Sequence, residues 1–121
     1  MRFEDLEAWK RARGLVRAIY GMSEKSLLAR DYGLKDQVRR AAVSVMSNLA
    51  EGFERTHAIE KIQMYKVARA SAGEVRSLLY VLEDQEMVDP ERVNGARRLV
   101  EETGSMITGL IRSTEKYAPK K

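Results

Sequence analysis

The chain has 121 residues, a length that fits one domain able to bury roughly two-thirds of its unfolded surface. It holds 22 Lys and Arg against 18 Asp and Glu, one His and no Cys, so its formal net charge is +4. The absence of Cys excludes disulfides, thiolate metal sites and cysteine nucleophiles, and a single His excludes a multi-histidine metal centre. This composition favours binding over catalysis, and we expect no cofactor.

The sequence carries no sign of a targeting or membrane segment. No apolar run follows Arg2 near the start, as a secretory signal would require. The longest unbroken apolar stretch, residues 78–82, is far shorter than the ~20 residues that a membrane helix needs. We therefore expect a cytoplasmic protein with no membrane partner.

Apolar residues recur at steps of three and four along almost the whole chain, which is the period of amphipathic helices. The predicted helices are residues 5–22, 32–53, 58–86 and 90–117. Asp31 and Thr56 are predicted N-caps of the second and third helices, and Asp89 before Pro90 is predicted to cap the fourth.

The predicted connections are short, and short links make consecutive helices antiparallel neighbours. The fold class is therefore all-α, an antiparallel up-down-up-down four-helix bundle. We expect a single domain over residues 1–115, followed by a basic tail over residues 116–121.

The excess positive charge is confined to the first and last quarters of the chain. Residues 1–30 carry seven basic and four acidic side chains, and residues 89–121 carry seven and five. In an antiparallel bundle the first and last helices are usually neighbours, so these cations are predicted to form one face that binds the phosphates of RNA or DNA. The candidate residues are Lys10, Arg11, Arg13, Arg17, Arg92, Arg97 and Arg98.

An ordinary solvated face fits the same pattern, because the acids Glu7, Glu101 and Glu102 are interspersed among these cations. No aromatic residue is interleaved with them in the helical pattern, so we do not expect nucleic-acid bases to stack on this face.

The second predicted helix carries an unusual polar stripe with two small serines, which a simply exposed stripe would seldom hold. The stripe consists of Arg40, Ser44, Ser47, Glu51 and Arg55. We expect it to contribute to self-association, with tight helix pairing inside one bundle as the alternative. Asn48 is predicted to fix helix register, and Glu51 and Glu74 are predicted to pair with Arg39 or Arg40, either buried in the bundle or across a subunit interface.

One enzyme class remains open, because a metal-free helical enzyme such as a chorismate mutase needs only a few charged side chains around a dicarboxylate. The candidates for such a site are Arg13, Arg39, Arg40 and Glu51. A pocket between helices that gathers two arginines and a carboxylate would favour this alternative.

Residues 32–53 resemble the signature of a known family. The sequence reads Q-x-R-R-A-x-x-S from Gln37 and S-N-x-A-E-G from Ser47. This pattern is similar to that of the four-helix-bundle proteins encoded in intervening sequences of bacterial 23S rRNA genes, also called S23 proteins. These are related to the accessory variability protein of diversity-generating retroelements. Flanking similarity around residues 3–9 and 71–75 extends the resemblance to about residues 3–114.

The resemblance implies a homo-oligomer, typically a pentamer, with no established catalytic activity. In the retroelement relatives a basic surface binds nucleic acid and a reverse transcriptase, so these are possible partners. By position, the motif residues Arg39, Arg40, Asn48, Glu51 and Glu74 take structural or interface roles. Met46 stands where the family usually has proline, so the second helix is expected to be less kinked.

Overall fold

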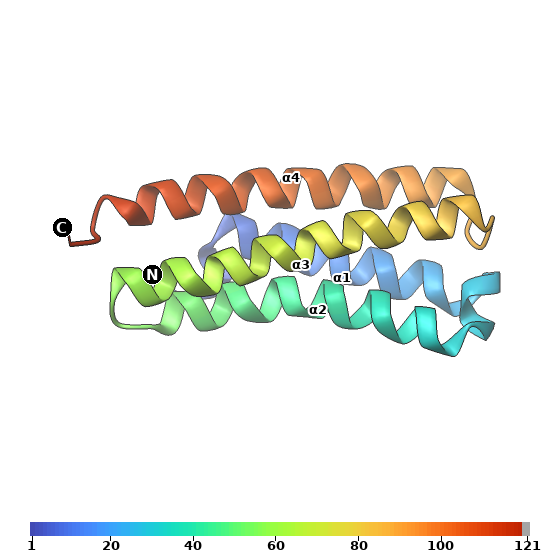
Figure 1. The fold of residues 1–121 in the computed structure, drawn as a ribbon, viewed down its shortest axis with the longest axis horizontal. Helices are drawn as coiled ribbons and strands as arrows, with labels where there is room; N and C mark the ends of the chain where they lie inside the picture. Colours follow the sequence, from blue (N-terminus) through green and yellow to red (C-terminus); the bar gives the residue numbers. More distant parts are fainter. Residues whose placement is uncertain (120–121) are drawn as a thin grey trace.

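The computed structural model describes residues 1–119, and over that part of the chain it contains four α-helices and no strand. The helices are α1 (Glu7–Glu24), α2 (Tyr32–Glu54), α3 (Ala58–Asp84) and α4 (Pro90–Glu115), with short 3-10 helices η1 (Phe3–Asp5) and η2 (Leu27–Arg30) (Figure 1). The all-α prediction is confirmed, and each predicted helix boundary lies within two residues of the observed one. Lys120 and Lys121 of the predicted basic tail lie outside the described residues.

Two of the three predicted N-caps are confirmed. The carboxylate of Asp31 accepts a hydrogen bond from the Leu34 amide at 3.1 Å, and that of Asp89 accepts one from the Arg92 amide at 3.3 Å. The cap predicted at Thr56 is wrong. A cap at Thr56 would place the first helical residue at 57, whereas α3 begins at Ala58 and its N-cap residue is His57. The first helical bond of α3 runs from the Lys61 amide to the carbonyl of His57, and no side chain caps this end of the helix.

Each helix packs against two others, so the four form a closed ring around one core. α1 and α3 each contact α2 and α4 and lie diagonally across the bundle (Figure 1). The α1–α2 and α3–α4 connections line a common cavity at one end of the molecule. The α2–α3 connection lies at the other end, together with the N-terminal residues and the end of α4.

The core follows the predicted helical period. Fully buried side chains come from every helix, for example Ile19, Val45, Val75 and Ile107. α2 runs without interruption past Met46, which is half-buried against the core. No helix within residues 1–119 is long and apolar enough to cross a membrane.

Gly52 marks the closest approach of α2 and α3. A Cβ atom added to Gly52 would lie 2.7 Å from a ring carbon of Tyr65 and 3.0 Å from the Cβ atom of Met64. Tyr65 is one of the largest fully buried side chains, and the Met64 Cβ atom is fixed by the backbone of α3, so an added methyl group would push the two helices apart. The close pairing of these two helices therefore depends on glycine at this position.

We expect Gly52→Ala to lower the free energy of unfolding by about 1–3 kcal/mol, because overpacking outweighs the gain in helix propensity. The matched control is Gly109→Ala in α4, where an added Cβ meets nothing within 4 Å. That variant should be stabilised by about 0.5–1 kcal/mol. Urea unfolding followed by circular dichroism measures both changes, and equal changes in the two variants would contradict this account of the α2–α3 contact.

Candidate functional site

The exposed basic side chains of α1 form one stripe along the helix. Lys10, Arg13 and Arg17 follow one another at steps of three and four, and all three are exposed. The spacing arises because the opposite side of α1 carries the buried residues, including Leu15 and Ile19. We call these three residues the α1 stripe.

The α1 stripe faces solvent between the flank of α1 that meets α4 and the flank that meets α2. On one flank of α1, Arg11 forms an ion pair with Glu102 of α4. On the other flank, the guanidinium carbon of Arg39 in α2 lies 4.2 Å from the centroid of the Tyr20 ring. Tyr20 comes three residues after Arg17 and so continues the α1 stripe.

α1 and α4 are neighbours, as expected, but several of their arginines are paired with carboxylates. Arg11 pairs with Glu102, Arg92 approaches Asp89 at 3.6 Å, and Arg97 approaches Glu83 at 3.2 Å. Arg97 also covers the ring of Tyr80 at 4.6 Å. Arg98 is exposed and forms no ion pair within residues 1–119. Because Arg97 turns to Glu83 and Tyr80 of α3, on the far side of α4 from α1, the structure does not bring all seven candidate cations to one face.

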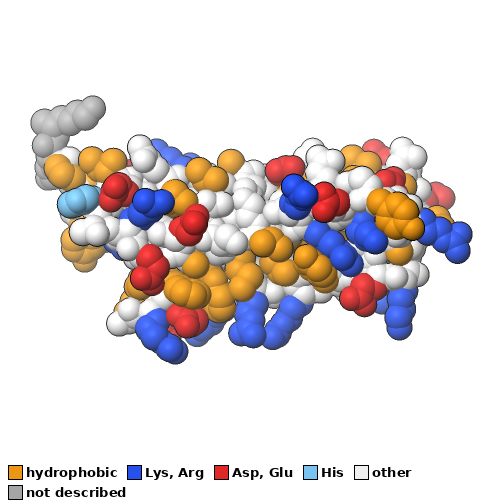
Figure 2. Space-filling model, turned by 90° about the horizontal axis from the view of Figure 1, so that it is seen from below, with side chains coloured by type: hydrophobic (Ala, Val, Ile, Leu, Met, Phe, Trp, Pro, Cys, Tyr) orange, Lys and Arg blue, Asp and Glu red, His pale blue; other side chains and the backbone are white. Residues whose placement is uncertain are grey.

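Aromatic rings accompany the α1 stripe, contrary to the expectation from the helical pattern. Tyr20 is 38% exposed, and Arg39 is held over it by a 2.8 Å hydrogen bond from its Nε atom to the hydroxyl of Ser23. Arg13 lies 5.8 Å from the ring centroid of Trp9. Figure 2 shows Lys and Arg side chains along the lower edge of this side of the bundle, beside a band of hydrophobic side chains. The place of Tyr20 on the α1 stripe was the sequence signal for this arrangement.

The polar stripe of α2 divides into two parts. Ser44 shares a 2.8 Å hydrogen bond with Ser71 of α3, and the amide of Asn48 donates to the carbonyl and hydroxyl of Ser44 at 2.8 and 3.0 Å. Ser44 therefore helps to pair α2 with α3 inside the bundle, and Asn48 holds the Ser44 hydroxyl from one turn later on the same helix. Ser47, Glu51 and Arg55 are exposed.

The predicted ion pairs of the motif residues do not form within the single chain, and pairs across a subunit interface stay a prediction. Arg39 turns toward α1, where it contacts Ser23 and Tyr20, and Arg40 pairs at 2.8 Å with Asp36 one turn earlier on its own helix. Glu51 and Glu74 are exposed and form no ion pair within residues 1–119. A partner at spacing i, i+4 is always within reach on a helix, which explains why Arg40 binds locally.

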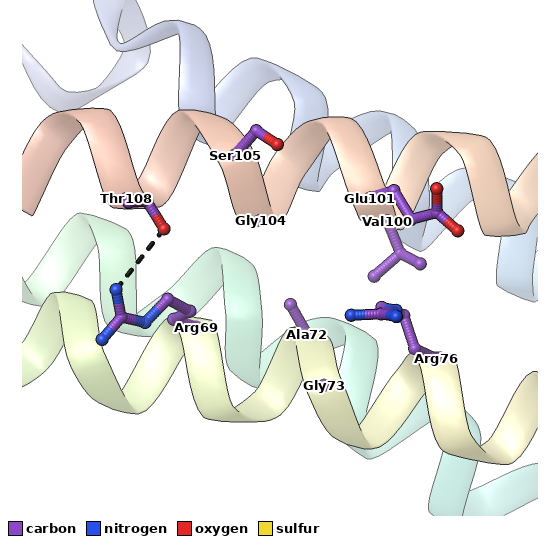
Figure 3. A pocket seen from close by; sticks show the side chains of 9 residues that line it. All are labelled: Arg69, Ala72, Gly73, Arg76, Val100, Glu101, Gly104, Ser105 and Thr108. Atoms are coloured by element: carbon purple, nitrogen blue, oxygen red, sulfur yellow. Dashed lines mark hydrogen bonds between the residues drawn. The ribbon is translucent and has the colours of Figure 1, made fainter.

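A groove of about 460 Å³ between α3 and α4 contains two arginines and a carboxylate. Arg69, Arg76 and Glu101 surround a floor that includes Ala72 and Gly104, and Arg69 donates a 3.4 Å hydrogen bond to the Thr108 hydroxyl (Figure 3). This is the combination that the enzyme alternative requires, but it uses none of the predicted residues. Arg13, Arg39, Arg40 and Glu51 lie on α1 and α2 and do not line this groove.

All three charged residues of the groove are exposed, so water screens their fields. Within residues 1–119 there is also no group of three or more His, Cys, Asp or Glu side chains that could hold a metal ion.

Comparisons with known proteins agree with this architecture. The model of one family, 23S rRNA-intervening sequence protein, matches residues 4–109. The crystal structure of a protein of unknown function from the S23 ribosomal protein family of Bacteroides thetaiotaomicron superposes with a TM-score of 0.78. That superposition covers 87% of this chain and 95% of the other at 16% sequence identity. No curated protein gave a significant match.

Proposed function

We propose that this chain, which belongs to the family of 23S rRNA-intervening sequence proteins, is a non-catalytic, cytoplasmic binding protein. It is an up-down-up-down bundle that self-associates, as a pentamer, and binds RNA through the α1 stripe. The observation that carries RNA binding is the exposed row of Lys10, Arg13 and Arg17, which ends at the stacked pair of Tyr20 and Arg39.

The pairing of charges favours the α1 stripe over Arg11, Arg92 and Arg97. Arg11, Arg92 and Arg97 each have a carboxylate within ion-pair distance, so much of their field is already compensated. Of the α1 stripe, Lys10 approaches Glu7 at 3.5 Å, while Arg13 and Arg17 form no ion pair within the described chain. Arg98 is also exposed and unpaired within residues 1–119, but it lies on α4, away from the pair of Tyr20 and Arg39. Arg13 and Arg17 are therefore the candidate cations best placed to bind phosphates beside that pair.

The stacked pair favours single-stranded RNA over a duplex. Tyrosine rings and guanidinium planes are both surfaces on which unpaired bases stack. The hydrogen bond from Arg39 to Ser23 fixes the guanidinium in place, so little ordering is needed when a base arrives. In a pentamer, five copies of a +4 chain give a formal charge of +20, which strengthens the attraction for a polyanion.

We expect the triple variant Lys10→Ala, Arg13→Ala, Arg17→Ala to flatten the slope of log affinity against log salt by about 2. Each lost single-strand phosphate contact accounts for about 0.7 of this change. The matched control removes three cations, Lys66, Arg69 and Arg76, from the diagonally opposite helix α3 and should leave the slope nearly unchanged. Fluorescence anisotropy with a labelled single-stranded RNA measures both slopes, and an equal response from the two variants would reject the α1 stripe.

Self-association is supported by an exposed apolar strip that runs beside the polar stripe of α2. Val67 of α3 is 48% exposed and Val43 of α2 is 37% exposed, and Ser47 is exposed on α2. Ser44 and Ser71 join the two helices on this side of the bundle. Small and β-branched side chains there allow a second copy to approach closely.

Ser47→Arg should therefore dissociate the oligomer, because it places a long charged side chain in the interface, while the helical content stays constant. Ser105→Arg on α4 is the matched control, since it adds the same exposed charge away from α2 and should leave the mass unchanged. Light scattering measures the mass of each variant. A Ser47→Arg protein with the mass of the unmodified oligomer would exclude this surface as the interface.

A second candidate function is metal-free catalysis on a dicarboxylate in the α3–α4 groove, favoured by Arg69, Arg76 and Glu101. We rank it lower because the groove is open to water, whereas catalytic electrostatics act strongly only where water is excluded. An absorbance assay with chorismate tests this candidate. We expect no turnover above the uncatalysed rate, and turnover that Arg76→Ala abolishes would establish it.

A further inference from the structure

One end of the bundle holds a cavity of about 750 Å³ that no step of the proposed function uses. It lies between the N-terminal residues, the α2–α3 connection and the end of α4, and four of its apolar lining residues are Leu6, Phe53, Ile59 and Leu110. Its volume falls in the range of about 300–1,000 Å³ that is typical of small-molecule sites.

The charged and titratable lining of this end cavity favours an anion. Lys61 and His57 line it, and the lining residues include no Asp or Glu. The first turn of α3 also lines the cavity, and no side chain caps this helix. The amide groups of an uncapped first turn, together with the helix dipole, attract negative charge.

Tyr65 provides a second, independent indication of a ligand. It lines the end cavity, is only 2% exposed, and its hydroxyl makes no hydrogen bond to another residue within 1–119. Burial raises the pKa of this phenol, so the group stays neutral and able to donate near neutral pH. The fully buried side-chain atoms without a partner within residues 1–119 belong to Arg97, so the Tyr65 hydroxyl keeps some accessible surface, and a ligand in the end cavity can accept its hydrogen bond.

We propose that the end cavity binds a small amphipathic anion, a carboxylate joined to an apolar chain or ring. The carboxylate lies near Lys61, His57 and the first turn of α3. The apolar part packs between Leu6, Phe53 and Leu110, and the hydroxyl of Tyr65 donates a hydrogen bond to the ligand.

The end cavity is separate from the α1 stripe. Lys10, Arg13 and Arg17 do not line it, so ligand binding here does not depend on RNA binding by α1. The two proposals can therefore fail independently.

The direct test is a fluorescence titration with 1-anilinonaphthalene-8-sulfonate, an apolar anion. It is followed by competition with three ligands that share a ten-carbon chain, each kept below its solubility or micelle limit. We expect decanoate to displace the probe at least tenfold more effectively than decanol, and decyltrimethylammonium to be the weakest. Equal displacement by all three would overturn the anion assignment, and absence of probe binding to the folded protein would overturn the site.

Variants locate the binding. Ser113→Trp fills the end cavity from an exposed position and should weaken decanoate binding at least tenfold. The matched control, Ser105→Trp, adds the same side chain in the α3–α4 groove and should have no effect. An unchanged affinity in Ser113→Trp, with the helical circular dichroism signal intact, would place the ligand elsewhere.

Two conservative variants test the polar contacts. Tyr65→Phe removes only the hydroxyl and should weaken decanoate binding on the order of threefold to tenfold.

Lys61 donates a hydrogen bond to the carbonyl of Phe53. The variant Lys61→Gln keeps a donor for that carbonyl while removing the positive charge. This variant should lose the preference for decanoate over decanol, and a retained preference would contradict the role of Lys61. RNA binding should remain unchanged in both variants.

Discussion

The burial of one apolar stripe from each of four helices in a common core is the constraint on which the rest of this structure depends. Once Leu15 and Ile19 of α1 face that core, the two flanks of α1 must face its neighbours. The flank toward α4 holds Arg11, which meets Glu102. The flank toward α2 holds Tyr20, which meets Arg39. The α1 stripe lies between these two flanks and faces solvent, and for this reason it is available to bind a partner.

The helices were predictable because their signals are local. Steps of three and four recur within each segment, and the caps at Asp31 and Asp89 lie three residues before the amides that they bind. Thr56 failed as a cap because a shift of one residue changes which side chain faces the first turn. The α1 stripe, being a property of one helix, was predictable for the same reason.

Which basic side chains form ion pairs with carboxylates was not predictable, because several of these pairs join residues that are distant in the sequence. Arg11 and Glu102 are 91 residues apart, and only the packing of α1 against α4 brings them together. Within the single chain Arg39 and Arg40 are instead engaged by Ser23 and Asp36. The end cavity is likewise assembled from the N-terminal segment, α2, α3 and α4, so no single stretch of sequence indicates it.

The proposed function depends most directly on contact between RNA, the α1 stripe and the adjoining Tyr20. Ultraviolet crosslinking of the protein to single-stranded RNA, followed by mass spectrometry of the crosslinked peptides, tests this contact without any substitution. The account predicts crosslinks on the α1 peptide that contains Tyr20. Crosslinks confined to peptides of α3 or α4 would contradict it.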